Sequence, residues 1–129
     1  MNIGDKLPEI LGLNEKGEQV TRESLAGKKV VLYVYPKDNT SGCTAEACSL
    51  KDHYQELSDK GYIVIGVSKD SAASHQKFID KYSLPFPLIA EVDTTQLQQL
   101  GAWGEKSMCG KKYMGALRTT YLINENGTI

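Results

Sequence analysis

The chain has 129 residues, which fits one compact domain able to bury a hydrophobic core. Charged residues make up 24% of it and the formal net charge is -1, so nothing favours nucleic acid as a partner. The N-terminus lacks a basic segment followed by an apolar run, and the longest apolar stretch, Val30 to Tyr35, is too short to span a bilayer. We therefore expect a single domain over residues 1–129 that binds neither nucleic acid nor membrane.

The first half of the chain predicts a hairpin, a buried strand and a long helix. Glu9 to Leu13 and Glu18 to Thr21 flank a turn and are typical of a short hairpin. Lys29 to Tyr35 is β-branched and aromatic without alternation, which predicts a strand buried on both faces. After a polar loop, residues 43–60 carry apolar side chains at spacings of three and four, which predicts one helix that ends at Gly61.

The second half of the chain continues the alternation of strands and helices. We expect strands at Tyr62–Val67, Leu88–Ala90 and Thr119–Ile123, and helices at Ser71–Tyr82 and Thr94–Leu100. This order predicts an α/β fold, a three-layer sandwich with a mixed central sheet. Within the helix that begins near Ser71, His75 is expected to start a solvated face.

The end of the chain carries a turn signal at Asn124 to Gly127. Such a turn promises a partner strand for the strand before it, yet the sequence stops at Ile129. This leaves open whether a terminal strand and helix are missing from the sequence.

Cysteine usage indicates redox chemistry in a reducing compartment. Three cysteines, an odd number, argue against the disulfide scaffold of a secreted protein, so we expect the cytoplasm. Cys43 falls in the first helical turn after a buried strand, an edge where α/β sheets place their sites. The helix N-terminus favours a thiolate, which is the nucleophilic form. The alternative is that Cys43 packs as a small buried hydrophobe, although its neighbours Gly42 and Thr44 supply no apolar pocket.

Cys48 lies five residues beyond Cys43. In a regular helix the two Cα atoms are then roughly 8.6 Å apart and the sulfurs point about 140° apart. A disulfide needs a Cα separation below about 7 Å, so bonding would require the first turns to unwind. The alternative is that Cys48 is a buried helix residue with no role in chemistry.

The motifs around this turn resemble those of a known family. Pro36-x-x-x-Thr40-x-x-Cys43 resembles the active-site signature of the peroxiredoxins. The string from Tyr35 to Cys48 resembles their bacterioferritin comigratory protein branch, also called peroxiredoxin Q. Further matches cover nearly the whole chain: Gly66 to Asp70, Ser74-His75, Pro85 to Leu88, Trp103 to Lys106, Tyr113 to Gly115 and Arg118 to Thr120.

This resemblance implies a thioredoxin-like fold and the reduction of hydrogen peroxide and organic hydroperoxides without metal, haem or flavin. It implies that Cys43 is the peroxidatic cysteine and Cys48 the resolving cysteine. The sulfenic acid on Cys43 would become an intramolecular disulfide, which thioredoxin or a similar dithiol donor would reduce. We expect the protein to act as a monomer in cell redox homeostasis.

The resemblance also implies roles for four other residues. Thr40 would accept a hydrogen bond from Cys43 and orient the peroxide, beside Gly42 in the substrate site. Pro36 would shield the thiolate from water. Arg118 would approach Cys43 from the adjacent strand, and a guanidinium there would stabilise charge moving onto oxygen. Arg118 opens a predicted buried strand, where an arginine needs a reason; the alternative is a surface arginine at a strand end.

The sequence differs from the family pattern at two positions, and other functions must be weighed against peroxide reduction. Ser41 replaces a common proline, which predicts a more mobile loop, and Cys109 replaces a common tyrosine, as a bystander or an auxiliary thiol. A thioredoxin-like disulfide reductase is a rival function, but such proteins usually carry Cys-x-x-Cys, whereas four residues separate Cys43 from Cys48. A metal site of Cys43, Cys48 and His53 is disfavoured, because a spacing of five puts them on different sides of a helix. A non-catalytic peroxide sensor would share the reactive cysteine but would not turn over.

Overall fold

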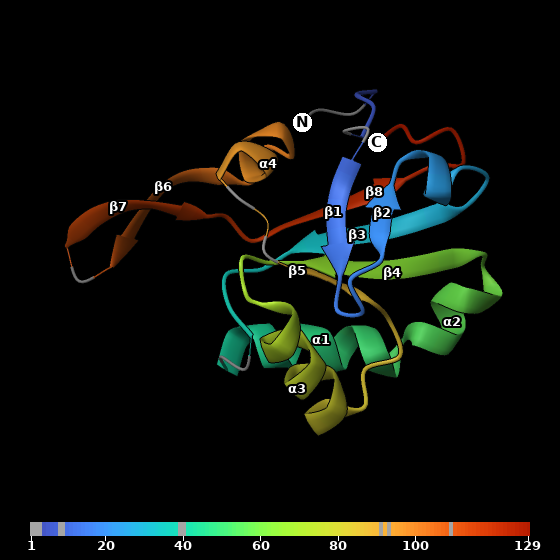
Figure 1. The fold of residues 1–129 in the computed structure, drawn as a ribbon, viewed down its shortest axis with the longest axis horizontal. Helices are drawn as coiled ribbons and strands as arrows, with labels where there is room; N and C mark the ends of the chain where they lie inside the picture. The colour runs from blue at the N-terminus through green and yellow to red at the C-terminus, as the bar shows by residue number, and fades with distance from the viewer. Residues whose placement is uncertain (1–3, 8–9, 39–40, 91, 93, 109) are drawn as a thin grey trace.

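The computed structural model describes residues 4–7, 10–38, 41–90, 92, 94–108 and 110–129. They form a sheet of six strands with helices on both faces, and a two-stranded hairpin projects from this body (Figure 1). The strands are β1 (Ile10–Asn14), β2 (Gln19–Thr21), β3 (Lys29–Val34), β4 (Tyr62–Val67), β5 (Leu88–Ala90), β6 (Trp103–Met108), β7 (Lys111–Ala116) and β8 (Thr119–Ile123). The helices are a 3₁₀ turn η1 (Glu23–Leu25), α1 (Ser41–Asp52), α2 (Tyr54–Asp59), α3 (Ala72–Tyr82) and α4 (Thr94–Gln99).

The main sheet is mixed, with the strand order β2-β1-β5-β4-β3-β8. Strand β4 pairs in parallel with β3 and with β5, whereas the other pairs are antiparallel. Parallel neighbours need a crossover, and α1 with α2 supplies it between β3 and β4, as α3 does between β4 and β5. Helices α1 to α3 lie on one face and α4 on the other (Figure 1). The predicted α/β sandwich with a mixed central sheet is confirmed.

Strand β3 is buried on both faces, as its sequence predicts. Val30, Leu32 and Val34 pack into the core that α4 covers. Val31 and Tyr33 alternate with them and pack into the core beneath α1 and α3. Because side chains of a strand alternate between faces, an unbroken apolar run gives both cores their central wall. Because β3 packs against both cores, its carboxyl end has a defined position between the helices on the two faces of the sheet.

The predicted helix over residues 43–60 is divided in two. Helix α1 ends at Asp52, and His53 leaves helical geometry with φ -99° and ψ 4° before α2 begins. The His53 side chain contacts the Ser49 carbonyl oxygen through Nδ1 at 2.8 Å, which accompanies the break. Gly61 follows α2 with a φ of +82°, so the predicted glycine at the helix end is confirmed. Within the described ranges, no helix has the length and apolarity that a membrane span requires.

The hairpin of β6 and β7 is an element that the sequence patterns above do not predict. Its six residue pairs run from Trp103–Ala116 to Met108–Lys111, and the arm extends away from the sheet (Figure 1). Glycines face each other at Gly104 and Gly115, and lysines are interspersed, so neither strand has the alternation of a half-buried strand.

Strand β8 is an edge strand, not the buried strand that the sequence predicts. It pairs with β3 alone, and its Leu122 is 60% exposed.

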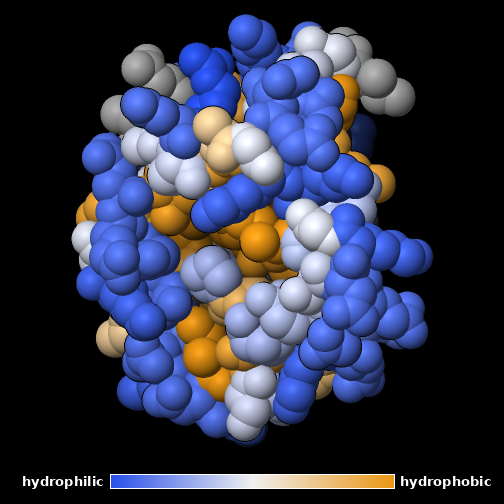
Figure 2. All heavy atoms as spheres, turned by 90° about the vertical axis from the view of Figure 1, so that its right-hand side faces the viewer, coloured by the Kyte–Doolittle hydropathy of each residue, from blue (hydrophilic) through white to orange (hydrophobic). Residues whose placement is uncertain are grey.

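Figure 2 shows apolar surface in a hollow on the side of the molecule that lies to the right in Figure 1. Beyond the turn after β8, Thr128 pairs with Lys6, and the Ile129 N–H donates to the Asp5 carbonyl at 2.9 Å. The residues after the turn therefore find their partners at the N-terminal end of the chain.

The close packing of β4 generates a stability prediction. A methyl group at Gly66 would lie 2.6 Å from Leu88 Cδ2 and 2.9 Å from Tyr33 Cζ, both in the core. Overpacking a core costs about 1–3 kcal/mol, so we expect Gly66→Ala to lower the free energy of unfolding in urea by that amount. The matched control is Gly115→Ala, whose methyl meets the flexible Lys106 side chain at 3.0 Å. Equal losses in the two variants would contradict the packing argument.

Candidate active site

Cys43 lies in the first turn of α1, which follows the loop after β3. It is 1% exposed and packs in the core cluster that contains Tyr33, Tyr35 and Ala47. The sequence neighbours of Cys43 supply no apolar pocket, but the sheet beneath it does. Burial alone would fit the reading of Cys43 as a small packed hydrophobe, so the polar contacts of its sulfur decide what the residue can do.

A guanidinium holds the Cys43 sulfur from the side of β8. Arg118 Nη2 donates to Cys43 Sγ at 3.2 Å, and Nη1 donates to Glu46 Oε1 at 2.9 Å. Partial burial opposes the charged form of Arg118, but the hydrogen bond and charge of Cys43, and then Glu46, raise the pKa of Arg118 above its usual range. Arg118 therefore stays cationic, and it offers positive charge to the Cys43 sulfur.

Glu46 is the residue in this cluster that the sequence reasoning does not single out. It follows Cys43 by three positions, so both side chains lie on one face of α1. The fork of Arg118 bridges them, which fixes the guanidinium at two of its nitrogens. The sequence did offer one sign of this role: Cys43 and Glu46 are three residues apart in one predicted helix, a spacing that lets a single arginine contact both.

The backbone at Gly42 lies close to the same guanidinium. A methyl group at this position would lie 3.3 Å from Arg118 Nη2, tighter than ordinary contact. Gly42 therefore leaves room for the Arg118 side chain to reach Cys43 past the first turn of α1. In the described residues the expected neighbours Gly42, Cys43 and Arg118 are thus brought together.

The other residues named from the sequence are placed less completely. Pro36 is half-buried in the loop between β3 and α1, and Cys48 is half-buried on α1. Cys43 and Cys48 are both free thiols. Thr40 and Cys109 lie outside the described residues.

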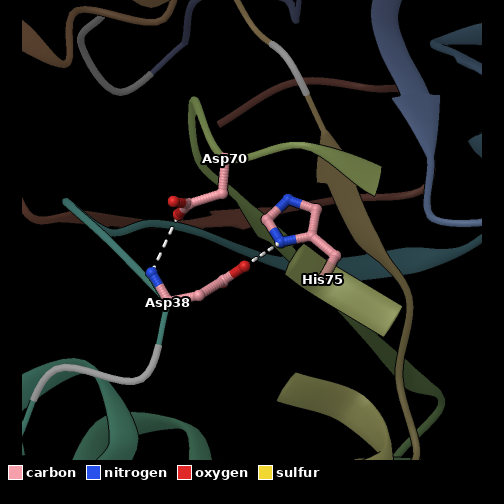
Figure 3. A group of neighbouring side chains, drawn as sticks. All are labelled: Asp38, Asp70 and His75. Carbon is pink, nitrogen blue, oxygen red and sulfur yellow. Dashed lines mark hydrogen bonds and ion pairs between the residues drawn. The ribbon is translucent and has the colours of Figure 1, made fainter. Parts of the chain in front are cut away.

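A buried hydrogen-bond network lies beside this loop (Figure 3). The expectation that His75 begins a solvated face of α3 is wrong, because His75 is 0% exposed. Its Nδ1 lies 2.7 Å from Asp38 Oδ2, and its Nε2 lies 2.9 Å from the Ile89 carbonyl oxygen. Tyr35 Oη donates to the other carboxylate oxygen of Asp38. The physical reason for the burial is that a carboxylate and a carbonyl together satisfy both nitrogens of the ring.

The partners of His75 determine its charge. A carbonyl oxygen and a carboxylate oxygen only accept hydrogen bonds, so both ring nitrogens must carry hydrogen and the ring is an imidazolium. Burial lowers the pKa of His75, but the hydrogen bond and charge of Asp38 outweigh it and raise that pKa. Burial likewise raises the pKa of Asp38, but the hydrogen bonds from His75 and Tyr35 outweigh it and lower that pKa. Asp38 and His75 therefore form a buried ion pair.

The same geometry argues against a metal at this cluster. Ligand atoms of Asp38, Asp70 and His75 all lie within 4.8 Å of one another. A metal binds the unprotonated nitrogen of a histidine, and here both nitrogens hold hydrogens toward acceptors. Asp70 Oδ2 accepts from the Ser68 hydroxyl at 2.7 Å and from the Asp38 N–H at 2.8 Å. The oxygen atoms that a metal ion would need as ligands thus already accept hydrogen bonds from the protein's own N–H and O–H groups.

The ion pair generates a pH prediction. Because the pKa of His75 is raised on folding, its contribution to stability is complete below about pH 6.5 and is lost as the pH rises through the folded pKa. Because the pKa of Asp38 is lowered, its contribution is complete above about pH 4 and is lost as the pH falls through the folded pKa. In urea unfolding, the stability difference between the wild type and His75→Gln should be largest between these limits and should shrink toward pH 10. A difference that is constant from pH 5 to pH 10 would contradict this assignment.

Comparison with known proteins places the chain in a family. The sequence profile of the AhpC/TSA family matches residues 3–129. The chain is 46% identical over 129 residues to a bcp peroxiredoxin homologue of Coxiella burnetii, covering 100% of this chain and 85% of that protein. It matches Xanthomonas campestris peroxiredoxin Q with a TM-score of 0.84 and 35% identity over 91% of this chain and 74% of that one.

A second structure from Xanthomonas campestris, of the bacterioferritin comigratory protein, matches with a TM-score of 0.83 and 32% identity. The match covers 96% of this chain and 83% of that one. These matches confirm the resemblance found in the motifs, and they extend it over the fold. The chain therefore belongs to the AhpC/TSA family, in its Bcp or peroxiredoxin Q branch, whose general activity is thiol-dependent peroxide reduction.

Proposed function

We propose that this protein reduces peroxides with Cys43 as the nucleophile and Cys48 as the thiol that resolves the oxidised sulfur. The observation that carries the proposal is the contact of 3.2 Å between the Arg118 guanidinium and the Cys43 sulfur. The thiolate is the attacking form of cysteine, and a guanidinium at this distance suits the stabilisation of negative charge as it moves from sulfur to oxygen. The related structure from Xanthomonas campestris is described in terms of its alkyl peroxide reduction activity, so organic hydroperoxides are proposed as substrates beside hydrogen peroxide.

The first chemical step is attack of the Cys43 thiolate on the terminal oxygen of the peroxide. An S–O bond forms, the O–O bond breaks, and the sulfur becomes a sulfenic acid while hydroxide or alkoxide leaves and takes a proton. Negative charge moves from sulfur to the leaving oxygen during this step. Arg118 is fixed by Glu46 beside the sulfur, so its free N–H groups suit stabilisation of that charge without reorganisation.

The second step is attack of the Cys48 thiol on the sulfenic sulfur, which forms a disulfide and releases water. Both cysteines belong to α1, where a separation of five residues keeps their Cα atoms roughly 8.6 Å apart. A disulfide therefore needs the first turns of α1 to unwind. A dithiol donor such as thioredoxin then reduces the disulfide by thiol–disulfide exchange.

The nucleophile is tested by Cys43→Ser. Serine is not ionised at neutral pH, so we expect peroxide consumption with a thioredoxin system to fall far more than tenfold. The matched control is Cys48→Ser, which should still consume about one equivalent of peroxide per chain because Cys43 remains. Retention of activity within tenfold in Cys43→Ser would contradict the proposal. A wild type that reacts once and does not turn over with any dithiol donor would favour the peroxide-sensor alternative.

The role of the guanidinium is tested by Arg118→Ala in a Cys48→Ser background. Loss of one such donor typically costs about a hundredfold or more, so the oxidation of Cys43 should slow by that order. Arg118→Lys keeps the charge but loses the fork and should lie between the two. Glu46→Gln breaks a partly exposed ion pair worth about 1 kcal/mol or less, so we expect a slowing of about fivefold at most. A rate in Arg118→Ala equal to that of the wild type would remove Arg118 from the mechanism.

Unwinding is tested by hydrogen exchange before and after one equivalent of peroxide. Amides in the first turns of α1 should lose protection on oxidation, while those of β3 and β4 keep it. Peptide mapping should find Cys43 joined to Cys48 within one chain. A disulfide to Cys109 or to a second chain, or unchanged protection from Cys43 to Lys51, would contradict intramolecular resolution.

A further inference from the structure

The loop between β3 and α1 is fastened at one residue, Asp38. Its N–H donates to Asp70 Oδ2 at 2.8 Å, in the loop that follows β4. Its carboxylate accepts from Tyr35 at the end of β3, and from Ser74 Oγ at 2.8 Å and His75 Nδ1 at 2.7 Å, both on α3. Backbone and side chain together therefore tie this loop to two other parts of the fold, the loop after β4 and helix α3, while Tyr35 adds a bond within the loop.

The anchor lies close to the reactive turn. Only two residues separate Asp38 from Ser41, where α1 begins, and five positions separate it from Cys43. A shift of Asp38 would move the start of α1, and with it the sulfur, relative to Arg118, which precedes the neighbouring strand β8.

We propose that Asp38 and His75 are positioning residues for the reaction of Cys43, holding the loop against α3 so that the sulfur meets Arg118. The proposal rests on the proposed function, because it takes Cys43 as the nucleophile. Neither residue contacts the sulfur; they act through the loop. The unwinding that brings Cys43 to Cys48 then begins beyond Asp38, and the anchored end guides the turn back after reduction.

This role predicts opposite effects on the two steps. Oxidation of Cys43 needs the folded turn and its contact with Arg118, so a weakened anchor should slow it. Disulfide formation needs the open turn, so the same change should leave it unaffected or speed it. General loss of stability would instead lower the active fraction or alter both rates in the same direction.

The test measures both rates in the full chain by rapid quench, alkylation and mass spectrometry after mixing with hydrogen peroxide. We expect Asp38→Asn and His75→Gln to slow Cys43 oxidation at least tenfold while disulfide formation does not slow. Leu97→Ala is the control for general destabilisation, because Leu97 is 0% exposed on α4 at the opposite face of the sheet. It should leave the ratio of the two rates within twofold of the wild type.

Two milder variants decide the question if the first pair does not fold. Ser74→Ala and Tyr35→Phe each remove one hydrogen bond to Asp38 and leave the ion pair in place. Each should change the ratio of the rates about threefold in the same direction. Ratios within twofold of the wild type in every folded variant, or the same change in Leu97→Ala, would overturn the proposal.

Failure of this inference is distinguishable from failure of the proposed function. If Cys43→Ser keeps its peroxidase activity in the same assay, the nucleophile is wrong whatever the loop variants do. If Cys43→Ser is inactive and the loop variants keep the wild-type ratio, the proposed function stands and only the positioning role falls.

Discussion

A buried sulfur facing a fixed cation is the interaction on which the rest of the structure depends. Cys43 is enclosed by the core beneath α1, where a thiolate without a partner would be costly. Arg118 supplies the partner, and Glu46 holds the guanidinium in place. The three residues come from α1 and from the residue that precedes β8, so the sheet must set their separation. Pairing of β8 with β3 over five residues does this, since α1 is the next helix after β3 and is joined to it by one short loop.

The proposed chemistry would place two opposed demands on the same segment. The oxidation step favours a rigid first turn in α1, because the sulfur must stay beside Arg118. Joining Cys43 to Cys48 requires that turn to come apart, because five residues of intact helix hold the sulfurs on different sides. The fold meets these demands within one short segment. Asp38 is tied to the body of the protein by a buried ion pair. Gly42, four positions later, has no side chain that could hold the first turn of α1 in place.

Much of the fold was predictable because its signals are local. The unbroken apolar run of β3 and the alternating helices and strands give the α/β class directly. The hairpin of β6 and β7 was not predictable, because its glycines and lysines remove the alternation that marks a strand. Strand β8 looked buried because Tyr121, Leu122 and Ile123 follow one another, although alternate side chains point to opposite faces and the one that carries Leu122 is exposed.

The candidate site likewise contains residues that local sequence signals reveal and residues that depend on contacts far apart in the chain. Cys43 and Cys48 stand out from their spacing and from the turn that carries them. Contact between Cys43 and Arg118 spans 75 positions. The family resemblance suggested it, and an arginine at the start of a predicted buried strand supported it. His75 reads as solvated because polar residues on an amphipathic helix usually are. Its partner Asp38 lies 37 positions away, in a loop that no periodicity describes. A buried charge is intelligible from sequence only once its counter-ion is known.

In the proposed reaction, the shared guanidinium would give oxidation a direct effect on the helix. If Cys43 reacts as the proposed thiolate, Arg118 would be held by two anions on one face of α1, one at the first turn and one a turn later. Sulfenic acid is neutral at this stage, so oxidation removes the first attraction and leaves Glu46 with the second. The first turn then loses its charged attachment to the strand side while the following turn keeps its own. Under the proposed mechanism, unwinding would thereby be favoured in the first turn of α1, and only after the peroxide has reacted.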